Sequence, residues 1–223
     1  AEQARPDPPR RRCPPPGLPE AASEPLPNHL PPSLAARARA EASLPLNLPP
    51  AGFEYADKVV GYVNDYRRCF HQGSTDHRGT PGAPGRTVTI EPAPGSKCWG
   101  AAFLCRGSDE YEAHVMKELE WREKQYDQRA YVDVFTAADE HSPVVPGALT
   151  FIATPDTIAN PNYLGPAPLE DIAQQIATAA GPSGPNYEYL FSIADAMREI
   201  QVDDPDLFEL ESRVKALMLP QRQ

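Results

Sequence analysis

Two periods of hydrophobic and polar residues predict the order of the elements in this chain. Stretches typical of strands, with alternation or with β-branched and aromatic residues, come first, at 57–70, 86–92, 97–107, 128–137 and 147–155. Helical period interrupts them once and dominates after them, at 110–125, 168–181, 186–200 and 205–219. The nearly continuous apolar stretch 147–155 predicts an internal strand. This order predicts an α+β fold with a small mixed or antiparallel, barrel-like sheet and surrounding helices.

Neither period is sustained in residues 1–51. That segment contains half of the 28 prolines and no aromatic residue. Proline fixes φ and removes a backbone donor, so we expect a disordered tail with at most a fleeting helix at 33–44. The globular domain is expected at 52–219. The tail's composition leaves open an organelle transit peptide, or a docking segment for a proline-recognising domain.

Charge and cysteine usage narrow the function classes. A net charge of -10 argues against binding of nucleic acid or an anionic membrane. No apolar run of about 18 residues is present, so no membrane span is expected. The four cysteines show no CxxC or CxxH spacing, which favours reduced thiols in a cytoplasmic protein.

Four acids lie in the charged stretch KELEWREKQYD at 117–127, and helical period separates one from the others. At about 100° per residue the inward stripe of the helix contains Glu112, Val115, Met116 and Leu119, and it ends on Glu123. Lys117, Glu118 and Glu120 fall largely elsewhere and are interpreted as solvated. Glu123 is therefore the candidate general base.

Two effects on Glu123 favour acid–base chemistry at cellular pH. Partial burial and the negative end of the helix dipole are both expected to raise the pKa of its carboxyl group. A raised pKa makes a glutamate a better general base near neutrality. The alternative is an ion pair with Arg122, Lys124 or Arg129, which would hold the pKa down.

The polar stretch HQGSTDHRGTPGAPGR at 71–86 is the most irregular part of the globular region. A Ser–His–Asp triad is not favoured, because Ser74, Asp76 and His77 are too close in sequence to converge, and no GxSxG is present. A metal site from Cys69, His71, Asp76 and His77 also lacks typical spacing. We expect a glycine-built loop whose polar side chains, including that of Arg78, cap the sheet or line a pocket, with Asp76 paired to Arg78.

A second polar loop, GPSGPNYEYL at 181–190, leads into a helix. Backbone N–H groups at a helix start bind carboxylates, so a small acidic ligand at Gly181–Asn186 is one interpretation. The other is a plain turn with Asn186 as the helix cap. Tyr163 and Tyr189 are expected either to place hydroxyls in a pocket or to be core tyrosines.

Read in order, five motifs resemble the ChaC-like gamma-glutamylcyclotransferases, over about Gly52 to Met218. They are the segment from GFEYADKVVGY to GRTVTIE, then CWGAAF, LEWREKQY, YLGPAPLEDIAQQI and GPSGPNYEYLF. The forms REKQYD and RRCFHQGSTDHRG are most similar to plant members. The resemblance implies a compact mixed barrel with helices. It also implies cleavage of glutathione to 5-oxoproline and cysteinylglycine without a metal or organic cofactor. We expect the protein to be a monomer.

The family's catalytic acid is the glutamate of its REK signature, which corresponds to Glu123. Further side chains are expected to contribute to substrate binding, namely Ser74, Asp76, His77, Arg78, Tyr163, Ser183, Asn186 and Tyr189.

One part of the family pattern has no match here. The family begins with a short strand and a Gly-Tyr-Gly-Ser-Leu loop that cradles the gamma-glutamyl group, whereas SLPLNLPPA precedes Gly52 in this chain. Ser43 and Leu44 are out of register with that loop, so no residue inherits its role and a core strand is expected to be missing. The alternative to an active enzyme is therefore a non-catalytic homologue that binds a gamma-glutamyl ligand or a protein partner.

Overall fold

A computed structural model describes residues 40–43, 55–105 and 107–219, with the backbone alone for 40–43. The chain divides into two units, Ala1–Arg37 and Ala38–Gln223, and only the second contains described residues. Within the predicted disordered tail, residues 1–51, the structure describes only residues 40–43. The domain boundary at residue 52 remains a prediction.

Five strands form one sheet in the order β2-β3-β1-β5-β4. They are β1 (Ala40–Ser43), β2 (Asp57–Ser74), β3 (Gly85–Leu104), β4 (Gln128–Val134) and β5 (Val145–Ile152). Strand β1 runs antiparallel to β3 and parallel to β5, so the sheet is mixed. Tyr62 and Phe135 exchange backbone hydrogen bonds of 2.8 and 2.9 Å, which join the two outer sides of the sheet at one bridge. The predicted α+β fold is confirmed, and no ladder closes a barrel among the described strands.

Strand β1 corrects two expectations from the sequence. Residues 40–43 were expected to have no regular structure beyond a fleeting helix, and they form a strand paired with Ala101–Leu104. The expectation that the sheet lacks a core strand is also wrong, because β1 lies between β3 and β5. Strand pairing along two neighbours can stabilise four residues that have no helical or alternating pattern of their own.

The long hairpin of β2 and β3 differs from the two shorter strands expected at 86–92 and 97–107. Residues 93–96 do not end β3, and the register between the strands shifts at Asp65. Gly95 has φ of +82°, a conformation that glycine adopts without strain, and its N–H donates to Asp65 Oδ1 at 2.8 Å. A turn signal in the sequence is thus used as a bulge within one bent strand.

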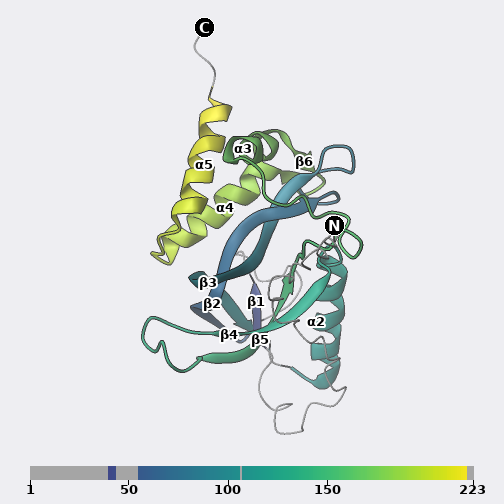
Figure 1. Cartoon of the computed structure of the whole chain (residues 1–223). Coiled ribbons are helices and arrows are strands. Elements are labelled where there is room, and N and C mark those ends of the chain that lie inside the picture. Colours follow the sequence, from purple (N-terminus) through teal and green to yellow (C-terminus); the bar gives the residue numbers. More distant parts are fainter. Residues whose placement is uncertain (1–39, 44–54, 106, 220–223) are drawn as a thin grey trace, which may run out of the picture. The chain divides into compact units, whose positions relative to one another are not determined.

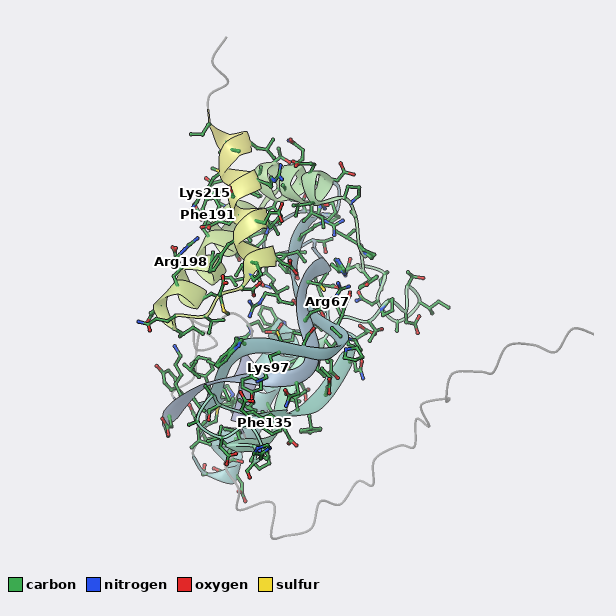
Figure 2. The ribbon with its side chains drawn as sticks, turned by 60° about the vertical axis from the view of Figure 1, so that its left-hand side comes forward. Arg67, Lys97, Phe135, Phe191, Arg198 and Lys215 are labelled. Carbon is green, nitrogen blue, oxygen red and sulfur yellow. The ribbon has the colours of Figure 1, made fainter. Side chains whose placement is uncertain are left out.

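Three helices pack beside one part of this hairpin, as Figure 1 shows: α3 (Leu169–Thr178), α4 (Asn186–Glu199) and α5 (Pro205–Met218). They share one apolar cluster with the hairpin, in which Leu190, Ile193 and Met197 of α4 are fully buried. At its edge the Lys215 ammonium lies 5.1 Å from the Phe191 ring and the Arg198 guanidinium 4.8 Å from the Phe208 ring. Figure 2 shows Lys215, Phe191 and Arg198 gathered where α4 and α5 meet.

Helix α2 (Asp109–Arg122) lies apart from these three helices, near β4 and β5 (Figure 1). Ser108 caps it, and the Ser108 hydroxyl accepts a hydrogen bond from the Tyr111 N–H at 3.2 Å. Its buried residues, Val115 and Leu119, form a small cluster with Cys105 and the part-buried Phe151. Lys117, Glu118 and Glu120 are exposed, so the predicted inward stripe is confirmed.

Two short pieces, β6 (Ala180–Gly181) and β7 (Gly184–Pro185), form a hairpin between α3 and α4. No helix in the described part of the chain is long and apolar enough to cross a membrane.

Candidate active site

Glu123 ends helix α2, as its C-cap residue. Its N–H donates to Leu119 O at 2.8 Å, and its carbonyl accepts from the Tyr126 N–H at 2.9 Å. These two bonds fix the turn that follows the helix, and the side chain is only 20% exposed. The position predicted from helical period, at the end of the buried stripe, is confirmed.

Of the three cations that the sequence offered as partners of Glu123, Arg122 forms the ion pair. The Arg122 Nε donates to Glu123 Oε1 at 2.5 Å. The two other candidate cations have different partners: Lys124 lies 2.9 Å from Asp76 Oδ2, and Arg129 lies 2.9 Å from Glu120 Oε1. Glu123 therefore keeps a cation beside one of its oxygens while Lys124 connects the same turn to the polar loop after β2.

Two tyrosines meet the backbone of Val88 close to this carboxylate. The Tyr126 hydroxyl donates to Val88 O at 2.7 Å, and the Tyr189 hydroxyl accepts from the Val88 N–H at 3.2 Å. Burial raises the pKa of Tyr126 well above its ordinary value and that of Tyr189 to about 12, and the negative charge of Glu123 adds to both shifts. Both phenols therefore keep their protons at neutral pH. Because Tyr189 accepts the bond from Val88, its own O–H can still donate.

Tyr126 is a residue that the sequence analysis did not single out. It lies beyond the end of α2, three residues after Glu123, where helical period no longer applies, so the pattern of the helix could not indicate it. Its buried hydroxyl fastens the turn carrying Glu123 to β3.

The structure brings the two polar loops together. Ser183 N–H donates to His77 O at 2.9 Å, and His77 Nδ1 lies 3.3 Å from Ser183 Oγ. The contact needs Gly181, because a Cβ there would lie 2.2 Å from His77 O. Ser74 is buried, and its Oγ accepts from the Arg78 N–H at 3.0 Å, so it shapes the first loop.

The expected pairing of Asp76 with Arg78 is wrong. Asp76 Oδ2 pairs with Lys124, while Asp76 Oδ1 is buried and accepts no hydrogen bond. Arg78 Nη1 donates to Pro185 O at 3.2 Å, and its guanidinium lies 5.9 Å from the centre of the Tyr189 ring. Asp76 Oδ1 also lies 3.8 Å from His77 Nε2 in the same loop, whereas Arg78 meets the segment at Pro185.

Asn186 is not the cap of α4. The N-cap is Pro185, and Asn186 begins the helix with its side chain fully buried against β3. Its Oδ1 accepts from Arg86 N at 2.6 Å and its Nδ2 donates to Arg86 O at 2.9 Å, so the side chain pairs with a backbone as a strand would. The buried Arg86 guanidinium in turn donates to Gln175 Oε1 and to the carbonyls of Phe70 and Gly165. Both residues hold the loops in place, and sequence period gave no sign of this junction.

Tyr163 belongs to a separate polar cluster. Its hydroxyl donates to Glu91 Oε1 at 2.8 Å. Cys69 and His71 contact the same carboxylate, whereas Asp76 and His77 point to Lys124 and Ser183. The four-residue metal set considered from the sequence is therefore replaced by Cys69, His71 and Glu91, whose ligand atoms lie within 4.8 Å of one another.

Comparison with known proteins places this arrangement in a family. Residues 48–217 match the family described as "ChaC-like protein". Gamma-glutamylcyclotransferase 2-1 of Arabidopsis thaliana is 47% identical over 171 residues, covering 76% of this chain and 79% of the relative. Glutathione-specific gamma-glutamylcyclotransferase 1 of Danio rerio is 43% identical over 173 residues, covering 75% of this chain and 84% of the relative.

A solved structure shares the fold. The selenomethionine-labelled yeast gamma-glutamyl cyclotransferase specific to glutathione superposes with a TM-score of 0.65 at 25% identity, covering 75% of this chain and 90% of that chain. Sequence match and shared fold agree, and this chain belongs to the ChaC-like family.

Proposed function

We propose that this chain is a gamma-glutamylcyclotransferase that cleaves glutathione to 5-oxo-L-proline and L-cysteinylglycine, with Glu123 moving the protons. The observation that carries the proposal is the placement of Glu123: a part-buried carboxylate, fixed by the turn after α2, beside two protonated tyrosines. The names of the Arabidopsis and zebrafish relatives supply the reaction and the substrate.

The reaction is an intramolecular cyclisation. The α-amine of the gamma-glutamyl group attacks its own γ-carbonyl carbon, a C–N bond forms to close a five-membered ring, and the amide bond to cysteine breaks. Nucleophile and electrophile belong to one molecule, so the protein mainly has to hold the substrate folded. Such geometry can lower a barrier by roughly 7–11 kcal/mol.

Glu123 balances the protons of this step. The α-ammonium first gives a proton to the Glu123 carboxylate, which leaves the amine free to attack. The same carboxyl group then gives the proton to the nitrogen of cysteinylglycine as it leaves. The ring nitrogen still carries a second proton, which it passes through the Glu123 carboxylate to the departing amine, so that the products are the neutral lactam and an ammonium. One group thus acts as base and then as acid, a role that typically contributes 10²–10⁴-fold in rate.

Tyr189 is proposed to stabilise the oxyanion that forms on the γ-carbonyl. Its hydroxyl is held by the Val88 N–H and its pKa of about 12 keeps the O–H available to donate. A fixed donor aimed at developing charge needs little reorganisation when the bond forms. Arg78, beside the Tyr189 ring and joined to Pro185 O, is proposed to bind a substrate carboxylate. The buried Asp76 Oδ1, without a hydrogen bond, is proposed as an acceptor for the α-ammonium.

The test is release of 5-oxoproline from glutathione by purified wild-type protein and by Glu123→Gln. We expect kcat to fall by roughly 10²–10⁴-fold in Glu123→Gln while glutathione still binds, because the amide keeps the shape but cannot carry the proton. Glu118→Gln makes the same chemical change at an exposed position of α2 and should retain wild-type turnover. Equal activity of Glu123→Gln and wild type would remove Glu123 from the mechanism. A folded wild-type protein without turnover would instead favour the non-catalytic homologue.

We also propose that the protein is a cytoplasmic monomer. Cys69 and Cys98 are buried free thiols, as in proteins kept in a reducing compartment. Sedimentation equilibrium should give a mass near 24.4 kDa, and a concentration-dependent increase would contradict the monomer. Imaging of the tagged full chain tests the location, and accumulation in an organelle would contradict it.

A further inference from the structure

A compact set of sulfur, nitrogen and oxygen ligands lies on the β2–β3 hairpin, on residues that the proposed reaction does not use. Cys69 and His71 are two residues apart on β2, and Glu91 is on β3. The register pairs Cys69 with Thr89 and Arg67 with Glu91, which brings Glu91 alongside the two β2 residues. The hairpin shifts register just after Cys69, and such bulges re-aim side chains.

The three side chains already converge on one point. The Cys69 thiol donates to Glu91 Oε2 at 3.5 Å, and His71 Nδ1 lies 2.5 Å from Glu91 Oε1. All three ligand atoms lie within 4.8 Å of one another. A tetrahedral ion with bonds of about 2.0–2.3 Å holds its ligand atoms roughly 3.3–3.8 Å apart. Side-chain adjustments of about an ångström would therefore suffice for all three to bind one ion.

We propose that Cys69, His71 and Glu91 form a binding site for a divalent transition-metal ion of the zinc class. A thiolate, an imidazole and a carboxylate are the ligand types that Zn²⁺ prefers, and two anions neutralise its charge. Cys69 and His71 are each 7% exposed, so water competes little for the ion. Binding releases the thiol proton to solvent and exchanges the hydrogen bonds within the cluster for metal bonds.

Two side chains next to Glu91, those of Tyr163 and Arg67, would affect how the ion binds. The Tyr163 hydroxyl, 2.8 Å from Glu91 Oε1, orients the carboxylate in the way that outer partners of metal ligands do. The fourth position of the ion falls to water. Arg67, 3.4 Å from Glu91 Oε2, opposes a cation, but its side chain is 56% exposed and can turn into solvent. Figure 2 shows Arg67 on the strands between the three C-terminal helices and the rest of the sheet.

Such an ion would join β2 to β3 and stabilise the hairpin, rather than take part in the cyclisation at Glu123. Removing a ligand residue should therefore lower the affinity for the metal, and removing the ion should lower the thermal stability. Neither change should alter which residue is the catalytic group. The proposal is independent of the proposed function, since neither requires the other.

The test is titration of Zn²⁺ into the metal-free full chain by calorimetry, with Co²⁺ as a spectroscopic probe. We expect one equivalent to bind, an increase in Tm on binding, and a thiolate-to-cobalt charge-transfer band. Cys69→Ser should remove that band and weaken binding by roughly 100-fold or more. Glu91→Gln should weaken it by roughly 10–100-fold. Cys98→Ser is the matched control: it removes another buried thiol, on the neighbouring strand, and should bind as wild type does.

Three outcomes would overturn the proposal: no stoichiometric binding by wild type, a cobalt complex without a thiolate band, or wild-type affinity in both Cys69→Ser and Glu91→Gln. If Cys69→Ser does not fold, Glu91→Gln still decides, because its side chain is part-exposed and the change keeps its shape. Glutathione turnover measured on the same samples shows whether the metal result and the proposed reaction stand or fall separately.

Discussion

The two helical regions of the molecule are held by cores of very different size. Helices α3, α4 and α5 share one continuous cluster with the β2–β3 hairpin, in which many residues are fully buried. Helix α2, which carries the candidate base at its end, has only a small cluster, in which its own Val115 and Leu119 pack with Cys105. Regions with few buried apolar contacts open at lower free energy than the whole domain. The proposed proton carrier therefore lies on the part of the domain that is easier to loosen, while the loops facing it are fixed by the larger core.

The largest effect should come from breaking the larger core. Leu190 of α4 is fully buried, so Leu190→Ala removes buried methyl groups and leaves a cavity; we expect the free energy of unfolding to fall by about 2–5 kcal/mol. Urea unfolding followed by circular dichroism measures this. Because the larger core supports the whole domain, α2 and α4 should lose their hydrogen-exchange protection together.

A smaller and more local effect is expected in the other region. Leu119→Ala should cost about 2–3 kcal/mol, because the small cluster can collapse partly around the missing side chain. Hydrogen exchange should speed up in 109–122 well before 186–199, and turnover should fall more than the change in global stability explains. Uniform loss of protection along the chain would contradict the distinction between the two cores.

The smallest expected effect is the loss of stability at acidic pH. Glu211 on α5 is buried, and burial alone would raise its pKa, but hydrogen bonds from Arg198 and Lys215 outweigh this and hold the pKa below its ordinary value of 4.5. A carboxyl group whose pKa is lowered by folding stabilises the protein above 4.5, and that contribution is lost as the pH falls through the lowered value. The free energy of unfolding, measured between pH 6 and 3, should therefore decrease.

The variant Glu211→Gln should show a shallower decrease, whereas Glu118→Gln, at an exposed site on α2, should follow wild type. Identical curves for all three proteins would show that the α4–α5 ion pairs add nothing to the larger core.

Local patterns predicted the elements and the side of α2 that is buried, because helical period is set by 3.6 residues per turn and needs no partner. The same period placed Glu123 at the end of the stripe. The strand β1 was missed because neither alternation nor propensity marks four residues whose pairing depends on two distant strands.

Contacts between side chains far apart in the chain could not be predicted from the sequence, because they also depend on distant segments. Asp76 and Arg78 are neighbours in the chain, yet their charges meet Lys124 and Glu188, with Lys124 48 positions beyond Asp76 and Glu188 110 positions beyond Arg78. Glu91 was not connected with Cys69 because their contact depends on strand register and a bulge. Asparagine is a common helix cap, but β3 lies close to Asn186, and its side-chain amide pairs with the backbone of Arg86 instead.

The central place of β1 in the sheet has a consequence for how the chain assembles. Only Ala40–Ser43 separates β3 from β5, and these four residues cover a hydrogen-bonding edge on each side. If they withdraw, two unpaired strand edges are presented at once, in the interior of a sheet rather than at its rim. These four residues therefore protect both interior edges from pairing with a strand of another molecule.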